Sequence, residues 1–271
     1  MAVHTSELVQ GMHVVRDGVE GGAPVVLVHG SGASGATWAP IVPALAGRHD
    51  VVRVDLPGCG QSPPAPDYEV PAQADRVAAV LDGLGLRGAT VVGHSSGGYI
   101  ATALAERRPE LVGSLALISS GPEPGALRPQ PLLLRLLLAP PLGPLVWKRR
   151  SDDMIRRGLL LTCARPVEIP DDLVAGVRTT GYRTTRAILR ANTTYIAERS
   201  IPARLADRGV PLLVVFGGAD PRWDPASAEQ YRAVPGARIE LLPEVGHLPM
   251  LEAPEATAEL VLDFTGAHAR P

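Results

Sequence analysis

A serine flanked by glycines, Gly93-His94-Ser95-Ser96-Gly97, stands where a run of β-branched residues gives way to a helical pattern. Gly-x-Ser-x-Gly at such a junction is typical of a nucleophile elbow, a sharp turn that holds a serine hydroxyl above the edge of a sheet. Glycine lets the backbone close around a turn of this kind because it has no Cβ. The pattern also arises by chance in glycine-rich turns, so Ser95 is a candidate nucleophile that needs partners.

A serine nucleophile needs a base, and the base needs a carboxylate that fixes its tautomer. Among seven histidines, His247 lies in a loop just after the last strand-like run, and the others lie near the termini, in an N-terminal hairpin, after a helix or within other motifs. Asp220 ends the preceding strand run and is the candidate acid. Asp224 competes, but it lies among prolines where Asp more often caps a helix. The chain order Ser95, Asp220, His247 is that of one known triad architecture.

The loop His29-Gly30-Ser31-Gly32-Ala33-Ser34-Gly35 follows the first buried strand run. As His-Gly-x-Gly, it would supply the backbone N–H of Ser31, which would join the N–H of Ser96 in an oxyanion hole. Losing one such donor costs ~3 kcal/mol in the transition state, which gives a tight glycine-rich loop a purpose. We therefore expect Ser31 and Ser96 to be the oxyanion donors.

The same loop also matches Gly-x-Gly-x-x-Gly, and Asp55 lies near the position of a ribose-binding acid. This match would predict a nucleotide-dependent oxidoreductase. The fingerprint helix would then contain Pro40, which costs ~3 kcal/mol inside a helix. We expect Pro40 in the first turn of a helix that begins near Thr37, and this favours the oxyanion interpretation.

The elements that must position these residues alternate along the chain. Strand-like runs occur at 25–28, 51–54, 90–92, 115–118, 212–216 and 239–242, and helical segments near 37–46, 72–84, 99–108, 226–233 and 255–267. The strand runs are continuously apolar, as in strands covered on both faces. The alternation predicts an α/β fold with a mostly parallel, doubly wound sheet. Two short runs near 8–10 and 13–16 predict a leading antiparallel hairpin.

The spacing of strand runs breaks once, from Gly121 to about Arg208. So long a stretch is not a simple connection inside a compact domain, and it should be an element of its own. We predict a helical cap at 121–208, inserted into a core formed by 1–120 and 209–271. Extra scaffold helices on the side of the domain are the alternative.

Composition narrows the class of protein. With 271 residues, 45% of them apolar, the chain can bury a large core. Its net charge of −2 does not indicate a nucleic-acid partner. Cys59 and Cys163 lack metal-ligand spacing and cannot make a disulfide framework. The N-terminus lacks a secretory pattern, and the most apolar stretch, 131–147, is too short and too broken by proline to span a membrane. We expect a cytoplasmic protein.

Together these motifs resemble those of the α/β-hydrolase superfamily, over nearly the whole chain. The motifs are the oxyanion loop from His29, the turn Asp55-Leu56-Pro57-Gly58-Cys59-Gly60-Gln61-Ser62, the elbow at Ser95, the acid turn Gly217 to Asp220 and the loop Gly246-His247. The resemblance implies that Asp55 structures a turn. Cys59 stands where the family often has His, outside the triad. Family members with an aspartate nucleophile, the haloalkane dehalogenases and epoxide hydrolases, are excluded by Ser95.

The resemblance implies a serine hydrolase that cleaves an apolar carboxylic ester through an acyl-enzyme, without metal or organic cofactor. Candidate contacts to the small-molecule substrate are Trp38, Leu137, Trp147 and Trp223, although the cap leucines could equally pack within the cap. The same residues would also serve thioesters, lactones, carbon–carbon bonds, perhydrolysis or lyase chemistry. A non-catalytic ligand receptor is a further alternative, and the sequence leaves the oligomeric state open.

Overall fold

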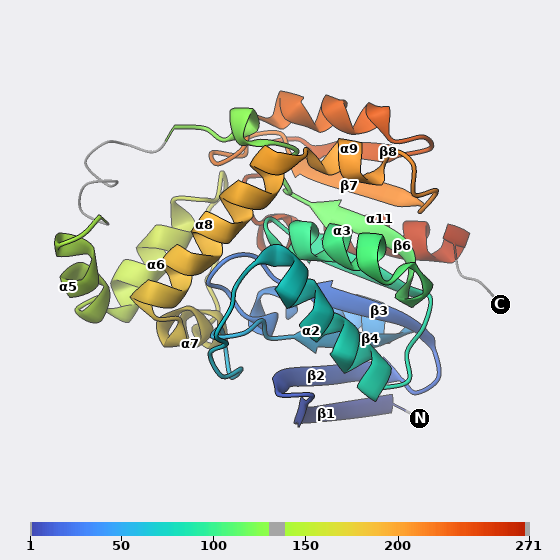
Figure 1. Ribbon diagram of the computed structural model, residues 1–271, viewed down its shortest axis with the longest axis horizontal. Helices are drawn as coiled ribbons and strands as arrows, with labels where there is room; N and C mark the ends of the chain where they lie inside the picture. The colour runs from blue at the N-terminus through green and yellow to red at the C-terminus, as the bar shows by residue number, and fades with distance from the viewer. Residues whose placement is uncertain (1, 130–138, 269–271) are drawn as a thin grey trace.

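The computed structural model describes residues 2–129 and 139–268. Its centre is an eight-stranded sheet in the order β1-β2-β4-β3-β5-β6-β7-β8. The strands are β1 (Ala2–Val9), β2 (Met12–Val19), β3 (Ala23–Val28), β4 (His49–Val54), β5 (Ala89–His94), β6 (Val112–Ile118), β7 (Leu212–Gly217) and β8 (Arg238–Leu242). Strand β2 pairs antiparallel with β1 and β4, whereas the remaining pairings are parallel. The predicted α/β fold with a mostly parallel sheet is confirmed (Figure 1).

Helices connect the strands and cover both faces of the sheet. The α-helices are α1 (Val42–Ala46), α2 (Val70–Gly83), α3 (Gly97–Arg107), α5 (Leu142–Lys148), α6 (Asp152–Leu160), α7 (Asp171–Thr179), α8 (Tyr182–Glu198), α9 (Ile201–Leu205), α10 (Pro249–Glu252) and α11 (Pro254–His268). Shorter 3-10 turns or helices are η1 (Gly35–Trp38), η2 (Pro109–Leu111), η3 (Pro124–Ala126) and η4 (Pro225–Ala233). Figure 1 shows α2 and α3 on the near face of the sheet and α11 on the far face.

The central strands are buried on both sides, in two separate cores. Val26 and Val28 of β3 belong to the core that includes residues of α2 and α3, whereas Val25 and Leu27 belong to the core that includes residues of α1 and α11. Successive side chains of a strand point to opposite faces, so both sets must be apolar. This is why the strand runs are continuous in the sequence rather than alternating.

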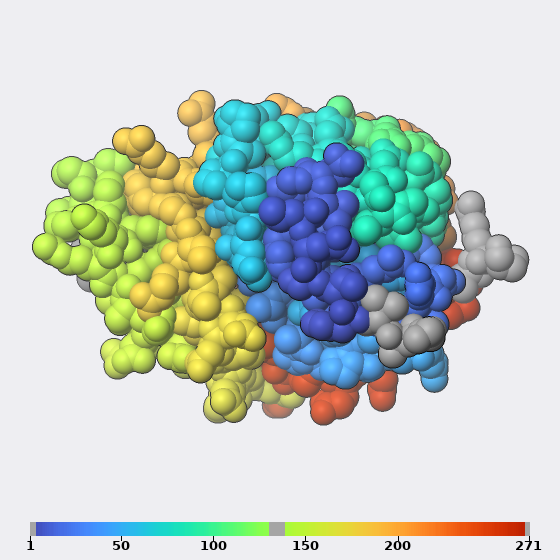
Figure 2. Space-filling model, turned by 90° about the horizontal axis from the view of Figure 1, so that it is seen from below, coloured from blue at the N-terminus to red at the C-terminus, as the bar shows by residue number. Residues whose placement is uncertain are grey.

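The N-terminal hairpin is longer than its sequence signal, and Figure 2 shows it, in dark blue, exposed at the surface. Charged pairs join its inner strand, β2, to β4. Arg16 Nε donates to Asp50 at 2.7 Å, and Arg53 donates to Asp17 at 2.7 Å. Charged cross-strand pairs of this kind stabilise strand pairing without producing an apolar run, so the sequence indicated only the parts of the two strands next to the turn, near 8–10 and 13–16.

The segment predicted as one helix at 37–46 consists of two elements. The 3-10 helix η1 ends at Trp38 and α1 begins at Val42, so Pro40 lies in the turn between them. The prediction that Pro40 occupies the first turn of a helix is wrong, because its missing N–H falls where a continuous helix would need a donor. Pro43 takes the first-turn position of α1 instead.

Between β6 and β7 the chain leaves the sheet. The described part of the segment 119–211 holds η3 and α5 to α9 and adds no strand to the sheet. In Figure 1, helices α5 to α8 gather at the end of the molecule opposite the two chain termini. We propose this segment as the cap, with the boundaries 121–208 predicted from the sequence.

Candidate active site

Ser95 sits on a strained turn between β5 and α3. Its φ angle is +51°, a left-handed conformation that side chains rarely adopt. The glycines on either side permit the turn. A Cβ on Gly93 would lie 2.5 Å from Gly98 Cα, and a Cβ on Gly97 would overlap the carbonyl oxygen of Val28. The sequence Gly-x-Ser-x-Gly therefore folds into a nucleophile elbow because only glycine fits on both sides of the serine.

Ser95, His247 and Asp220, here called the Ser95 site, form one hydrogen-bonded line. Ser95 Oγ lies 3.2 Å from His247 Nε2, and His247 Nδ1 lies 2.8 Å from Asp220 Oδ2. The three residues follow β5, β8 and β7, so the carboxyl ends of parallel strands bring them to one edge of the sheet. All three are buried, Asp220 completely.

Asp220 is held as a carboxylate. Its Oδ1 accepts hydrogen bonds from the backbone N–H groups of Arg222 at 2.7 Å and Trp223 at 3.1 Å. Burial by itself would raise the pKa of Asp220, but the hydrogen bond and charge of His247 and the two backbone donors outweigh burial and lower that pKa. An ionised Asp220 accepts a hydrogen bond from the N–H at Nδ1 of His247, which leaves the lone pair of Nε2 facing Ser95. Asp224 instead caps η4 by accepting from the N–H of Ala226.

Ser31 and Ser96, predicted to be the oxyanion donors, both line a cavity with Ser95. The N–H groups of Ser31 and Ser96 have no acceptor within residues 2–129 and 139–268. His29 fixes the loop that carries Ser31: its Nδ1 donates to the Gly30 carbonyl at 2.8 Å and its Nε2 accepts from Leu56 N–H at 2.9 Å. Burial lowers the pKa of His29, so the ring is neutral and can make both bonds.

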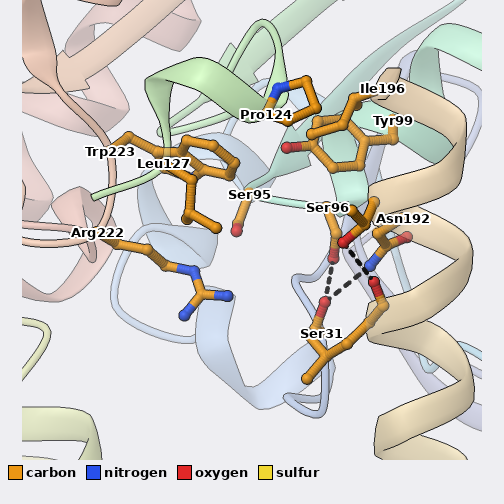
Figure 3. Close-up of a pocket in the computed structure, with 12 residues that line it drawn as sticks. Ser31, Ser95, Ser96, Tyr99, Pro124, Leu127, Asn192, Ile196, Arg222 and Trp223 are labelled. Carbon is orange, nitrogen blue, oxygen red and sulfur yellow. Dashed lines mark hydrogen bonds between the residues drawn. The ribbon is translucent and has the colours of Figure 1, made fainter. Parts of the chain in front are cut away.

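The side chains of the same two serines form a link to the proposed cap. Ser31 Oγ lies 2.7 Å from Ser96 Oγ, and Asn192 Nδ2 of α8 donates to Ser31 Oγ at 3.0 Å. Figure 3 shows this chain of contacts beside the Ser95 hydroxyl. Helix α8 therefore contacts the loop that presents the Ser31 N–H.

A cavity opens beside Ser95 and is shown in Figure 3. Its apolar lining comes from Pro124, Leu127, Leu189, Ile196 and Trp223, and its polar lining from Ser31, Ser95, Ser96, Tyr99, Asn192, Thr193 and Arg222. A second cavity on the side of His247 shares Ser31, Ser95, Leu189 and Arg222 with the first. Burial raises the pKa of Tyr99, and its hydroxyl has no partner among the described residues. The lining suits a mainly apolar ligand with a few polar groups.

The four predicted substrate contacts lie in different places. Trp223 lines the cavity beside Ser95. Trp38 is fully buried in the core that includes residues of α1 and α11, with its ring edge-on to His94 at 6.4 Å. Trp147 donates to the Thr180 carbonyl and lines an outer cavity with residues of α8. Leu137 lies outside the described residues.

The sequence interpretation missed three residues of this site, Tyr99, Asn192 and Arg222. Tyr99 and Arg222 each stand within four positions of a predicted triad residue, and this nearness was a usable signal. Asn192 gave only a weak one, a single amide on the buried face of a long helix. Its contact depends on how α8 packs over the sheet.

Asp55 has a structural environment rather than that of a ribose-binding acid. It is buried, its Oδ1 accepts from the N–H of Gly35 at 2.7 Å, and its Oδ2 accepts from the N–H of Gln61 at 2.9 Å and lies 2.9 Å from His13 Nδ1. Both carboxylate oxygens are therefore engaged in tying loops together. In the turn that Asp55 supports, Cys59 is buried, and burial raises the pKa of its thiol to about 11.

Residues 2–129 and 139–268 lack two kinds of feature. They contain no group of three or more His, Cys, Asp or Glu side chains arranged to hold a metal ion. They also contain no helix with the length and hydrophobicity needed to cross a membrane.

Comparison with known proteins places the chain in a family. A family model described as the alpha/beta hydrolase family matches residues 25–260. The chain is 34% identical over 244 residues to a pimeloyl-[acyl-carrier protein] methyl ester esterase of Neisseria meningitidis serogroup C, covering 89% of this chain and 92% of the relative.

Solved structures agree with this placement. The structure of a bacterial membrane phospholipase A, described as a virulence factor, is 28% identical, with a TM-score of 0.81 over 100% of this chain and 87% of its own. A 2-hydroxy-6-oxo-6-phenylhexa-2,4-dienoate hydrolase of a Rhodococcus strain shares the fold, with a TM-score of 0.80 at 22% identity, covering 98% of this chain and 100% of its own. The chain belongs to the α/β-hydrolase family of enzymes.

Proposed function

We propose that the protein is a carboxylic ester hydrolase in which Ser95 is the nucleophile. The observation that carries the proposal is the buried line from Ser95 to His247 to Asp220, at a cavity beside two unpaired backbone N–H groups. A serine with a positioned base and two oxyanion donors is what acyl transfer requires. Membership of the hydrolase family agrees with water as the final acceptor.

In the proposed mechanism, Ser95 Oγ attacks the ester carbonyl while His247 Nε2 takes its proton. Asp220 accepts the hydrogen bond from Nδ1 and stabilises the imidazolium that forms. The N–H groups of Ser31 and Ser96 bind the oxyanion of the tetrahedral intermediate. His247 then gives its proton to the leaving alcohol. A water molecule, deprotonated by the same imidazole, cleaves the acyl-enzyme and regenerates Ser95.

The proposed substrate is an ester with an apolar acyl chain. Leu127 and Trp223 lie side by side at the cavity, Ile196 lies across from them, and Leu189 adds to the lining (Figure 3). Burying each methylene of a chain against such side chains contributes ~0.8 kcal/mol. The named relative acts on the methyl ester of an acyl chain carried by a protein, which supports an acyl ester over the other bonds that this fold hydrolyses.

Hydrolysis of p-nitrophenyl esters from acetate to laurate tests the proposal. We expect wild-type turnover to rise with chain length until the cavity is filled, and Ser95→Ala to lower kcat by at least ~10³-fold. Ser6→Ala removes an exposed serine of β1 and should leave turnover unchanged. Retention of turnover in Ser95→Ala would exclude Ser95 as the nucleophile.

A second substrate separates esters from thioesters. A pantetheine thioester of a monomethyl dicarboxylic acid contains both bonds in one molecule, and its products show which one is cleaved. Release of methanol with the thioester intact supports the proposed ester specificity. Release of the thiol first would replace it with thioesterase activity at the same serine.

A further inference from the structure

One charged side chain at the cavity has no partner within the described residues. Across residues 2–129 and 139–268, six arginines make no hydrogen bond or ion pair through their side chains: Arg48, Arg149, Arg157, Arg183, Arg190 and Arg222. Five of the six are exposed, where water solvates the guanidinium. Arg222 alone is partly buried, and it lines both cavities next to Ser95.

Hydrogen bonds hold the main chain of Arg222 in place. The Arg222 N–H donates to Asp220 Oδ1 at 2.7 Å, and its carbonyl accepts from Arg128 N–H at 2.9 Å. Figure 3 shows the guanidinium extending into the space below the Ser95 hydroxyl. The residue that carries this charge is therefore hydrogen-bonded through its N–H to Asp220, the carboxylate that contacts His247.

The carboxylates of the same loop do not neutralise Arg222. Asp220 is engaged with His247, and the exposed Asp224 lies 3.9 Å from Arg128. Moving a charged group out of water without a partner is costly, and such groups are normally paired. A planar guanidinium with its donors free matches the geometry of a carboxylate, which it can bind through two parallel hydrogen bonds.

The rest of the cavity suits a chain that ends in such a group. Apolar side chains of Leu127, Leu189 and Ile196 line the same cavity as Arg222, and the Tyr99 hydroxyl, which has no partner among the described residues, points into the cavity in Figure 3. We propose that Arg222 binds a substrate carboxylate, so that the preferred substrates are half-esters of dicarboxylic acids with an apolar chain between ester and carboxylate. This inference rests on the proposed ester hydrolysis and names its substrate class.

A pair of substrates of equal shape tests the charge. Monomethyl adipate carries a terminal carboxylate, and methyl 5-carbamoylpentanoate carries a neutral amide of the same size. Methanol release gives kcat/KM for each ester. Because a hydrogen bond to a charged group is stronger than a neutral one, we expect wild type to prefer the carboxylate ~10- to 100-fold. In Arg222→Gln the two values should become equal, because the carboxylate substrate loses its charged partner.

Two further variants separate direct binding from the general field of the protein. Arg222→Lys keeps the charge but loses the fork, and should retain part of the preference. Arg183→Gln removes an exposed, unpaired arginine of α8 and should retain all of it. A preference that survives Arg222→Gln, or that falls equally in Arg183→Gln, would overturn the assignment.

Failure of this inference can be told apart from failure of the proposed function. Turnover of both esters without a charge preference would overturn the role of Arg222 and leave the esterase proposal standing. Absence of all turnover would count against the esterase proposal, and calorimetric binding of adipate monoamide to Ser95→Ala would then test Arg222 by itself. Binding that disappears in Ser95→Ala/Arg222→Gln supports the carboxylate site, and equal binding by both variants overturns it.

Discussion

Two regions of the molecule contain a serine, a histidine and an aspartate at hydrogen-bonding distances. In the Ser95 site the two contacts measure 3.2 and 2.8 Å. In the N-terminal hairpin, Ser6 Oγ lies 2.9 Å from His13 Nε2, and His13 Nδ1 lies 2.9 Å from Asp55 Oδ2. We call this second arrangement the Ser6 group. Its contacts are as short as those of the Ser95 site, so distances among three side chains do not identify a catalytic site.

The backbone under each serine separates the two regions. Ser6 lies in the regular strand β1, paired with Val15 of β2. In a strand the N–H groups lie in the plane of the sheet while side chains stand perpendicular to it, so no pair of donors converges beside the hydroxyl. Ser95 has a positive φ and leads directly into α3, which brings the Ser96 N–H beside its hydroxyl. The backbone turn at Ser95, rather than the three side chains, therefore distinguishes the Ser95 site from the Ser6 group.

Replacement by asparagine should therefore affect Asp220 and Asp55 differently. The loss of kcat in Asp220→Asn is the largest effect that we expect. Asp220→Asn should lower kcat by ~10⁴-fold with the fold retained, because an amide favours the wrong tautomer of the histidine. Asp55→Asn should leave the kcat of the folded enzyme unchanged but lower the free energy of unfolding by ~2 kcal/mol. The side-chain NH2 of the asparagine would replace one of the two oxygens that accept from the N–H groups of Gly35 and Gln61, so one of these donors would lose its acceptor. Steady-state kinetics and urea unfolding of both variants measure the contrast.

The converse result would break the comparison. A large loss of kcat in folded Asp55→Asn would give the Ser6 group a catalytic role. A loss of stability in Asp220→Asn without a loss of kcat would give the Ser95 site a merely structural one.

Reactivity of the serines towards a fluorophosphonate provides the next contrast. The reagent needs a nucleophile activated by a base and an oxyanion hole, so we expect one label per chain, on Ser95. Labelling of Ser6 should be at least ~100-fold slower, since two oxyanion donors are missing there. Peptide mass spectrometry locates the label in wild type and in Ser95→Ala. Rapid labelling of Ser6 in Ser95→Ala would contradict the distinction.

Sequence reasoning found the Ser95 site because strand order constrains it. Residues that directly follow parallel strands must meet at one edge of a sheet, so Ser95, Asp220 and His247 could be placed together before any coordinates. The Ser6 group could not be found in this way. Ser6 and His13 face each other across a hairpin whose strands are partly polar. Asp55 follows β4, which lies beside β2 in the sheet although it is distant from β2 in the sequence.

The residues that line the cavity were harder to predict than the three residues of the Ser95 site. Trp223 was placed correctly by its nearness to Asp220, whereas Trp38 fills the core because η1 turns its ring towards His94. Asn192 and Arg222 were missed for different reasons. Helix propensity and hydrophobic patterning do not fix how an inserted helix packs, and the pairing of an arginine is decided by neighbours that are distant in sequence.

Acid should destabilise the Ser95 region through His94, which is buried with its Nδ1 unpaired among the described residues. Burial lowers the pKa of His94 to about 3, against an ordinary value of 6.5. Between these values the unfolded chain binds a proton that the folded chain does not, so stability is complete above pH 6.5 and falls as the pH decreases, by up to ~1.4 kcal/mol per unit. Urea unfolding at pH 7 and pH 5 should show a smaller loss for His94→Gln than for wild type. An equal loss would show that other groups dominate acid unfolding.

The smallest effect concerns the link between the proposed cap and the oxyanion loop. Asn192 donates to Ser31 Oγ, and the N–H of Ser31 is one of the two proposed oxyanion donors. Asn192→Leu keeps the size of the side chain but removes the hydrogen bond, which is worth ~1 kcal/mol. If the bond holds the Ser31 N–H in place, kcat should fall ~5-fold with KM unchanged, and Thr194→Val, an exposed position of the same helix outside this cavity, should change neither. A rise in KM alone would instead assign Asn192 to substrate binding. The Ser95 site would then be complete without α8, and its elbow and oxyanion loop would suffice to distinguish it from the Ser6 group.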